Sequence, residues 1–294
     1  MNKNFFDNNK VLTSNLVWFI SLLPVLMFTS YKNGFLLASG GFLKTINAFY
    51  YLYVPILIII FSYLFEFIYY KLFKKSNLVN RVVNSSLPLF NVLCFLTMGP
   101  NVNVFVIVGV IFLVSLLSKL VKVNYICLFK LIVFLILMFY GSVSNANILQ
   151  STYNNGFGYL DLFIGFGISD IGNSTLFILC GYLILCFDST YKKDIPIISL
   201  LVYILFGLFL CYINKFTLNN LMINTFNSSL LFILVYVASV SIYSPVTFKQ
   251  KLIYSILIGI VASIVINLLN MVILLYLFIF LYSIYLCVFN KKYK

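Results

Sequence analysis

Long apolar runs separated by short polar segments extend along almost the whole chain. A membrane-spanning helix needs about 20 consecutive apolar residues, so the runs between polar segments predict transmembrane helices. Ten spans are expected, at residues 12–30, 49–73, 83–99, 103–120, 125–143, 173–187, 195–213, 227–243, 250–267 and 269–289. The pattern therefore predicts an all-α polytopic membrane protein with about ten transmembrane helices.

The composition agrees with this prediction and excludes most site chemistry. Apolar residues make up 63% of the 294 residues and charged residues only 9%, whereas about a quarter of the residues in a soluble domain are charged. Histidine is absent, and the six cysteines stand singly within apolar runs, without the paired spacing of a zinc or redox motif. We therefore expect no metal site and no catalytic residue in this chain.

The basic residues indicate how the chain crosses the membrane, because cytoplasmic loops are rich in lysine and arginine. With ten spans and a cytoplasmic N-terminus, all nineteen basic residues except Lys32, Lys44 and Lys215 face the cytoplasm. This partition explains the net charge of +13 without a nucleic-acid partner, and the basic residues contact membrane lipid head groups instead. It also predicts that both termini are cytoplasmic.

Two long segments, residues 31–48 and 144–172, then lie on the outer side of the membrane. Functional residues concentrate in such long connections. The second segment holds Asp161 and Asp170 among glycines, which makes it the more interesting of the two.

Glu66 is the acidic residue placed well inside a predicted span. It lies about 10 Å from the cytoplasmic end of the span, where a charge costs on the order of 3 kcal/mol. It is either an ion or proton site, or a structural carboxylate that a nearby tyrosine or lysine satisfies. In contrast, the cytoplasmic turn from Asp188 to Asp194, which contains Lys192 and Lys193, is expected to be solvated.

Two similar polar motifs open corresponding spans in the two halves of the chain. Asn84-Ser85-Ser86-Leu87 precedes the third span and Asn227-Ser228-Ser229-Leu230 the eighth, and a proline exit follows each span, at Gly99-Pro100 and Ser244-Pro245. Because each half has an odd number of spans, the halves run in opposite directions, as in many transport proteins. We predict two inverted five-helix repeats, the first in residues 1–145 and the second, with the outer loop, in residues 146–294. The alternative is that Asn and Ser recur here as helix N-caps.

Several segments together resemble the RnfD/NqrB family, the membrane subunits of ion-translocating, flavin-containing electron-transport complexes. The best match is the stretch from Ser244 to Tyr254, which is similar to the family pattern S-P-V-T-x-x-x-K-L-I-Y. Further matches in the same order are Phe65-Glu66, Asn84 to Val102, Asp161-Leu162-Phe163-Ile164-Gly165 and Ile171-Gly172-Asn173-Ser174-Thr175. The resemblance implies electron and ion transport in the bacterial cytoplasmic (inner) membrane, with other membrane subunits of an Rnf/Nqr-like complex as partners.

The flavin site departs from the family pattern. In the family, flavin mononucleotide (FMN) is attached to the threonine of an outer-loop S-G-A-T motif, whereas this chain has Ser144-Asn145-Ala146-Asn147. The amide of Asn147 cannot form the phosphoester, so the resemblance implies a diverged member without the covalent site. FMN or riboflavin would then bind non-covalently, near the outer loop and Ser244, Val246 and Thr247, where N–H groups at a helix start can hold phosphate. The alternative for this segment is a turn and N-cap.

Three functions follow from these observations. The resemblance favours a subunit of a redox-driven H⁺ or Na⁺ pump rather than a stand-alone enzyme, with Glu66 on the ion pathway and Asp161 and Asp170 in a redox-facing outer loop. The alternatives are a small-solute channel or carrier on the same inverted-repeat scaffold, and an inactive assembly subunit. The missing threonine favours the alternatives.

Overall fold

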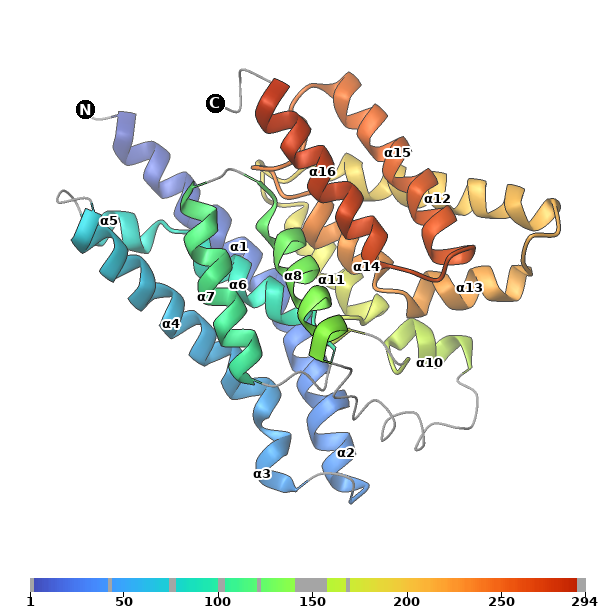
Figure 1. Ribbon diagram of the computed structural model, residues 1–294, viewed down its shortest axis with the longest axis horizontal. Coiled ribbons are helices and arrows are strands. Elements are labelled where there is room, and N and C mark those ends of the chain that lie inside the picture. Colours follow the sequence, from blue (N-terminus) through green and yellow to red (C-terminus); the bar gives the residue numbers. More distant parts are fainter. Residues whose placement is uncertain are drawn as a thin grey trace.

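The computed structural model describes residues 3–41, 44–73, 78–99, 104–120, 123–140, 158–167 and 170–289, and all regular structure in these ranges is helical (Figure 1). The prediction of an all-α membrane protein is confirmed. Five helical segments are long and apolar enough to cross a membrane, and a bent helix pair provides a sixth such segment. Four shorter apolar helices accompany them.

Helices of the N-terminal half begin with one long rod. It consists of α1 (Lys3–Ser30), the π-helical turn η1 (Tyr31–Phe35) and α2 (Leu36–Ser39). The remaining helices of this half are α3 (Thr45–Ala48), α4 (Tyr50–Phe73), α5 (Leu78–Val83), α6 (Leu87–Leu96), α7 (Val104–Leu120) and α8 (Tyr125–Tyr140).

Helices of the C-terminal half include a second interrupted rod. The elements are α10 (Tyr159–Ile164), α11 (Thr175–Leu185), α12 (Asp194–Tyr212), α13 (Leu218–Asn227), α14 (Leu230–Phe232), the π-helical η2 (Ile233–Ala238), α15 (Phe248–Asn267) and α16 (Ile273–Phe289). The interrupted rod consists of α13 on one side of the break at Ser228 and Ser229 and of α14 with η2 on the other, and the two parts are bent by 53°. Each of the ten predicted spans overlaps a helix in these two halves.

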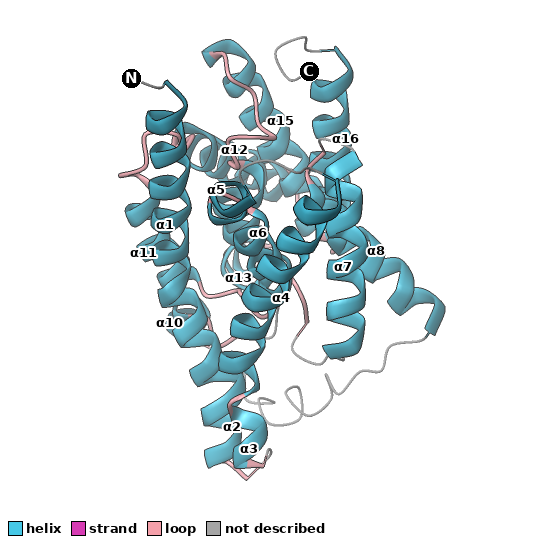
Figure 2. Ribbon diagram, turned by 90° about the vertical axis from the view of Figure 1, so that its left-hand side faces the viewer, coloured by secondary structure: helices cyan, strands magenta, loops and turns pink. Residues whose placement is uncertain are grey.

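The predicted outer loop at residues 31–48 is largely helical instead. The polar residues Lys32 and Asn33 are buried in a π-helical turn and apolar residues resume at Phe35, so the first helix extends to Ser39 before the chain turns back into α3. This hairpin closes tightly, because a Cβ at Gly34 would lie 2.3 Å from the carbonyl oxygen of Ala48. The α2–α3 hairpin projects from the bundle at the end opposite the start of α1 and the end of α16 (Figures 1 and 2). We call these the hairpin end and the termini end.

The core lies where α6 and η2 run through the centre of the bundle. All ten residues of α6 and all six of η2 are buried. The other helices surround them in antiparallel or crossing pairs, with α1 against α11, α4 against α6, α8 against α16 and α12 against α15. A helix that is buried on every side needs partners for any polar group near its ends, and these ends are where the charged residues lie.

Candidate functional site

A buried ion pair joins α4 to α7 near the start of α6. The ammonium of Lys119 lies 2.5 Å from Oε1 of Glu66, and the hydroxyl of Ser85 donates to the same oxygen at 2.7 Å. The Glu66 side chain is 0% exposed and that of Lys119 is 19% exposed. An unpaired charge here would carry a desolvation cost of several kcal/mol, so Lys119 provides the partner that the sequence demanded for Glu66.

The surroundings of this pair stabilise the lysine and leave part of the carboxylate unused. The Lys119 ammonium lies 5.4 Å from the ring centroid of Tyr69 and 5.2 Å from that of Tyr70, within cation–π range. Among the described residues, Oε2 of Glu66 has no hydrogen-bond partner. Glu66 therefore has both a structural role and one oxygen that can still accept a proton or a cation.

A second ion pair lies at the other end of α6. The ammonium of Lys130, on α8, lies 2.8 Å from Oδ1 of Asp170, and it also donates to the carbonyl of Thr97 just after α6. The hydroxyl of Ser229 donates to Oδ2 of Asp170 at 2.9 Å. The Lys130 ammonium lies 5.8 Å from the ring centroid of Tyr276, so this pair, like the first, has a serine hydroxyl on the carboxylate and a tyrosine ring beside the lysine.

The serines of the two pairs come from the two Asn-Ser-Ser-Leu motifs. α6 begins at Leu87 and α14 at Leu230, the last residue of each motif. The side chains of the residues at the N-cap positions, Ser86 and Ser229, do not accept a hydrogen bond from the helix that follows. Instead, each motif supplies one serine hydroxyl to a carboxylate. Both motifs thus bind a carboxylate at a helix break, through different serine positions, and Ser85 also accepts the Leu87 N–H at 3.2 Å at the start of α6.

The two ion pairs complement the dipole of α6. A carboxylate is favourable near a helix N-terminus and an ammonium near a C-terminus, and Glu66 and Lys130 occupy these positions through Ser85 and the Thr97 carbonyl. At about 1.5 Å per residue, Ser85 and Thr97 are about 18 Å apart along the helix. The arrangement places one ion pair at each end of a helix inside the bundle.

The two acidic residues predicted for the outer loop lie in different environments. Asp161 is exposed in the first turn of α10, where its carboxylate accepts the Gly158 N–H at 3.1 Å. Asp170 is half-buried and paired with Lys130. Lys130 was expected on the cytoplasmic side and lies inside the bundle instead; a lysine within an apolar run was the available signal.

The Ser244–Thr247 segment forms a turn and a helix cap. The buried Ser244 hydroxyl donates to the Val240 carbonyl at 2.8 Å, and the Thr247 hydroxyl oxygen accepts the Gln250 N–H at 3.4 Å at the start of α15. Val246 is 54% exposed. The Ser244 hydroxyl is therefore used within the fold, whereas Val246 and Thr247 are exposed beside the backbone N–H groups at the start of α15.

This segment is far from the Asp161 region. The twenty residues of α15 extend about 30 Å from Thr247 to Asn267. The Asn267 side chain accepts a hydrogen bond from Asn224 of α13 at 3.0 Å, and α13 packs on α10, which carries Asp161. The Ser244–Thr247 turn and Asp161 therefore lie at opposite ends of α15, and a single flavin cannot contact both.

Only part of the connection from Asp188 to Asp194 is solvated as expected, because Lys193 is exposed and the Asp194 side chain is 44% exposed but Asp188 and Lys192 are buried. Asp188 and Lys192 are each only 9% exposed. Asp188 accepts the Ser14 hydroxyl at 2.5 Å, while the Lys192 ammonium donates to the carbonyls of Ser241, at 2.8 Å, and Ser244. Burial, with a smaller contribution from the nearby Lys251 charge, lowers the pKa of Lys192 to about 7. No sequence pattern indicated this contact, because its acceptors are backbone carbonyls about fifty residues away along the chain.

The segment Ser144 to Asn147, where Asn147 replaces the threonine of the covalent flavin motif, lies outside the described residues. Within the described part of the chain, no group of three or more His, Cys, Asp or Glu side chains is arranged to hold a metal ion. The site that the structure does assemble is the pair of lysine–carboxylate clusters around α6.

A comparison with known protein families identifies the family of this chain. A model of the NQR2, RnfD, RnfE family matches residues 4–290. The chain therefore belongs to this family, whose members are subunits of Rnf- and Nqr-type membrane complexes. No individual curated protein matches the chain.

Proposed function

We propose that this protein is an RnfD-like subunit of a redox-driven ion pump in the bacterial cytoplasmic membrane, and that H⁺ or Na⁺ crosses it along α6. The observation that carries the proposal is the placement of two lysine–carboxylate pairs, one with a buried and one with a half-buried carboxylate, at the two ends of this helix. Family membership supports membrane partner subunits. The chain is proposed to act within their complex and not as a separate enzyme.

The chemistry of the pairs suits a pathway for cations. Each carboxylate is held by a lysine and a serine, so it can exchange one partner for a proton or a cation without being left unpaired. Interrupted helices near such groups are typical of membrane ion sites, because helix ends expose carbonyl and N–H groups inside the bilayer. Charge changes at redox centres on partner subunits would act strongly on these groups, since they lie in a medium of low dielectric constant.

The covalent flavin is proposed to be absent, because Asn147 replaces the threonine. Any FMN or riboflavin on this chain is then released by denaturation. The test is flavin fluorescence of the purified complex in a denaturing gel, with a family member that has the S-G-A-T threonine as positive control. No fluorescent band is expected for this chain, and a fluorescent band at its mass would refute the proposal.

The ion pathway is tested by transport in proteoliposomes that contain the complete complex. Glu66→Gln and Asp170→Asn are expected to reduce ion uptake at least tenfold relative to electron transfer, because each removes a carboxylate from one end of α6. Asp194→Asn is the matched control, since the Asp194 side chain is 44% exposed and lies 3.9 Å from the Lys251 ammonium, outside both clusters. Unchanged uptake in both variants would refute the pathway, and a stable complex without any ion uptake would favour the assembly-subunit alternative.

A further inference from the structure

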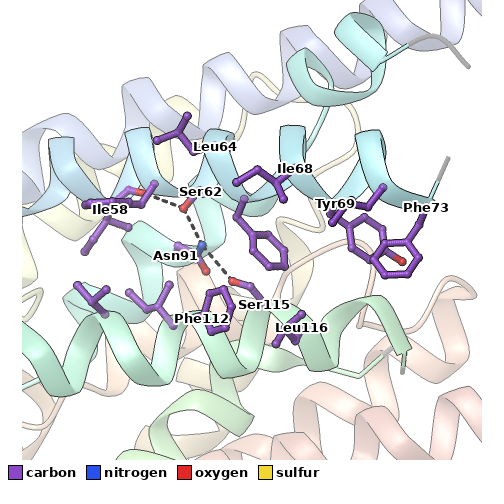
Figure 3. Close-up of a pocket in the computed structure, with 15 residues that line it drawn as sticks. Ile58, Ser62, Leu64, Ile68, Tyr69, Phe73, Asn91, Phe112, Ser115 and Leu116 are labelled. Atoms are coloured by element: carbon purple, nitrogen blue, oxygen red, sulfur yellow. Dashed lines mark hydrogen bonds between the residues drawn. The ribbon is translucent and has the colours of Figure 1, made fainter. Parts of the chain in front are cut away.

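An apolar groove of about 470 Å³ lies between α4 and α7, with α6 at its floor (Figure 3). Its walls are mostly aromatic and aliphatic, with Phe61 and Phe112 more than half exposed on the outer faces of their helices. In a membrane protein such side chains face lipid. The groove is therefore open to a ligand that is dissolved in the bilayer.

A polar group at the floor of this groove lacks a partner. The Asn91 side-chain N–H₂ donates to the Ser62 hydroxyl oxygen at 2.7 Å and to that of Ser115 at 3.4 Å (Figure 3). Asn91 is 1% exposed, and among the described residues its Oδ1 accepts no hydrogen bond. The Ser62 hydroxyl donates to the Ile58 carbonyl. Because buried polar atoms are almost always hydrogen-bonded, the groove offers an acceptor for an external donor.

The depth of this acceptor restricts what can reach it. Ser62 lies near the middle of the 24-residue helix α4, about 17 Å from either end. A phospholipid head group remains at the membrane surface, and a charged ligand at this depth would be costly. The ligand must therefore be a neutral lipid whose polar group can enter the hydrocarbon region.

We propose that this groove binds a neutral long-chain lipid that bears a hydroxyl group. The ligand hydroxyl would donate to Asn91 Oδ1 and can accept from the Ser115 hydroxyl, while its chain lies against Phe61 and Phe112. A quinone offers only acceptors and would leave Asn91 Oδ1 without a donor. The inference does not depend on ion transport by this chain.

The test uses the purified full chain in nanodiscs and two photoactivatable probes. One probe is hexadecanol carrying a diazirine on its chain, and the other is its methyl ether, which cannot donate a hydrogen bond. Labelled peptides are mapped by mass spectrometry. The alcohol is expected to label α4 and α7 about tenfold more strongly than the ether, the difference that one hydrogen bond to a buried acceptor provides. Unlabelled hexadecanol should compete with it.

Variants separate the hydrogen bond from the groove itself. Asn91→Leu is expected to lower the alcohol-to-ether labelling ratio to about one. Ser115→Ala should also lower this ratio, and it serves as the test if Asn91→Leu does not fold. Phe112→Trp narrows the groove and should reduce labelling by both probes. Ser118→Ala is the matched control, because the Ser118 hydroxyl donates to a carbonyl of its own helix, that of Ser115, and it should leave the ratio unchanged.

Several results would overturn the proposal. Equal labelling by alcohol and ether in the unmodified protein would show that a lipid chain, or an ordered water at Asn91, suffices. A ratio that persists in both Asn91→Leu and Ser115→Ala would place the hydrogen bond elsewhere. Stronger competition by a long-chain quinone than by hexadecanol would assign the groove to an acceptor-only ligand.

Discussion

Removing the two partners of the Glu66–Lys119 pair one at a time should have unequal effects. In Lys119→Met, the carboxylate of Glu66 stays at 0% exposure and keeps only Ser85 as a partner. In Glu66→Gln, the Lys119 ammonium keeps the two tyrosine rings and partial access to the surface. The stranded carboxylate is therefore the worse outcome.

The structure gives the size of this asymmetry. Removing one partner of a buried ion pair costs about 3–5 kcal/mol when the other charge stays buried, which is the value expected for Lys119→Met. Glu66→Gln loses a charged hydrogen bond but strands no fully buried charge, so about 1–3 kcal/mol is expected. The double variant removes both charges, and it should cost less than Lys119→Met alone.

Unfolding of the detergent-solubilised protein by SDS measures these differences. The single tryptophan, Trp18, is 5% exposed and packs edge-on against Tyr191 and Tyr236, so its fluorescence reports loss of the core. Lys71→Met serves as control, because Lys71 is exposed at the end of α4. If Glu66→Gln costs as much as Lys119→Met, or if the double variant costs the sum of the two, the pair is not the buried unit described here.

Three further predictions use the same unfolding assay. Asp170→Asn should cost about 1–3 kcal/mol, because the Lys130 ammonium keeps the Tyr276 ring, the Thr97 carbonyl and partial exposure; a double variant with Lys130→Met that costs the full sum of the two single losses would contradict the pairing. Gly165 has φ 116°, and a Cβ there would lie 2.6 Å from the Cα of Ser174, so Gly165→Ala should lower the free energy of unfolding by about 1–3 kcal/mol. Gly109→Ala is the control, because a Cβ there has nothing within 4 Å, and it should not destabilise the protein. The pKa of Lys192 falls from 10.5 to about 7 on folding, so the unfolded chain binds more protons than the folded one between these two pH values. The free energy of unfolding should therefore rise with pH in this range, by up to about 1.4 kcal/mol per pH unit. A rise of the same size in Lys192→Met would show that Lys192 does not cause it.

Each predicted apolar run overlaps a helix, because hydrophobic run length is a local property, while five helical segments, or six with the bent pair, are long and apolar enough to cross a membrane among the described residues. The apolar pattern did not predict that the first helix continues to Ser39, since a polar residue such as Lys32 marks a loop only if it reaches water. Lys32 instead donates to the Gly167 carbonyl at 2.5 Å. Contacts between segments far apart in the sequence decide whether a short polar stretch ends a helix.

The two lysine–carboxylate pairs were predictable only in part, because their partners come from segments far apart in the sequence. Glu66 was recognised as a buried acid in need of a partner, and both of its interpretations remain compatible with the pairing to Lys119. The second pair was not predicted, because Lys130 and Asp170 are 40 positions apart and meet only through the end of α6. The Asn-Ser-Ser-Leu motifs marked the correct helix starts, while their bonds to carboxylates depend on tertiary structure. Asn91 gave no signal, since one amide in an apolar run does not reveal what it faces.

The unequal lengths of the packed helices α1 and α11 make the protein sensitive to bilayer thickness. The rod from Val11 to Ser39 has 29 residues and is about 43 Å long, whereas the 11 residues of α11 extend about 17 Å, compared with about 30 Å of hydrocarbon. Leu183 and Phe187 at the end of α11 are 63% and 88% exposed. Such hydrophobic mismatch is relieved by local thinning of the membrane or by a neighbouring subunit. Acyl-chain length in reconstitution is therefore an experimental variable that acts on one side of this molecule more than on the other.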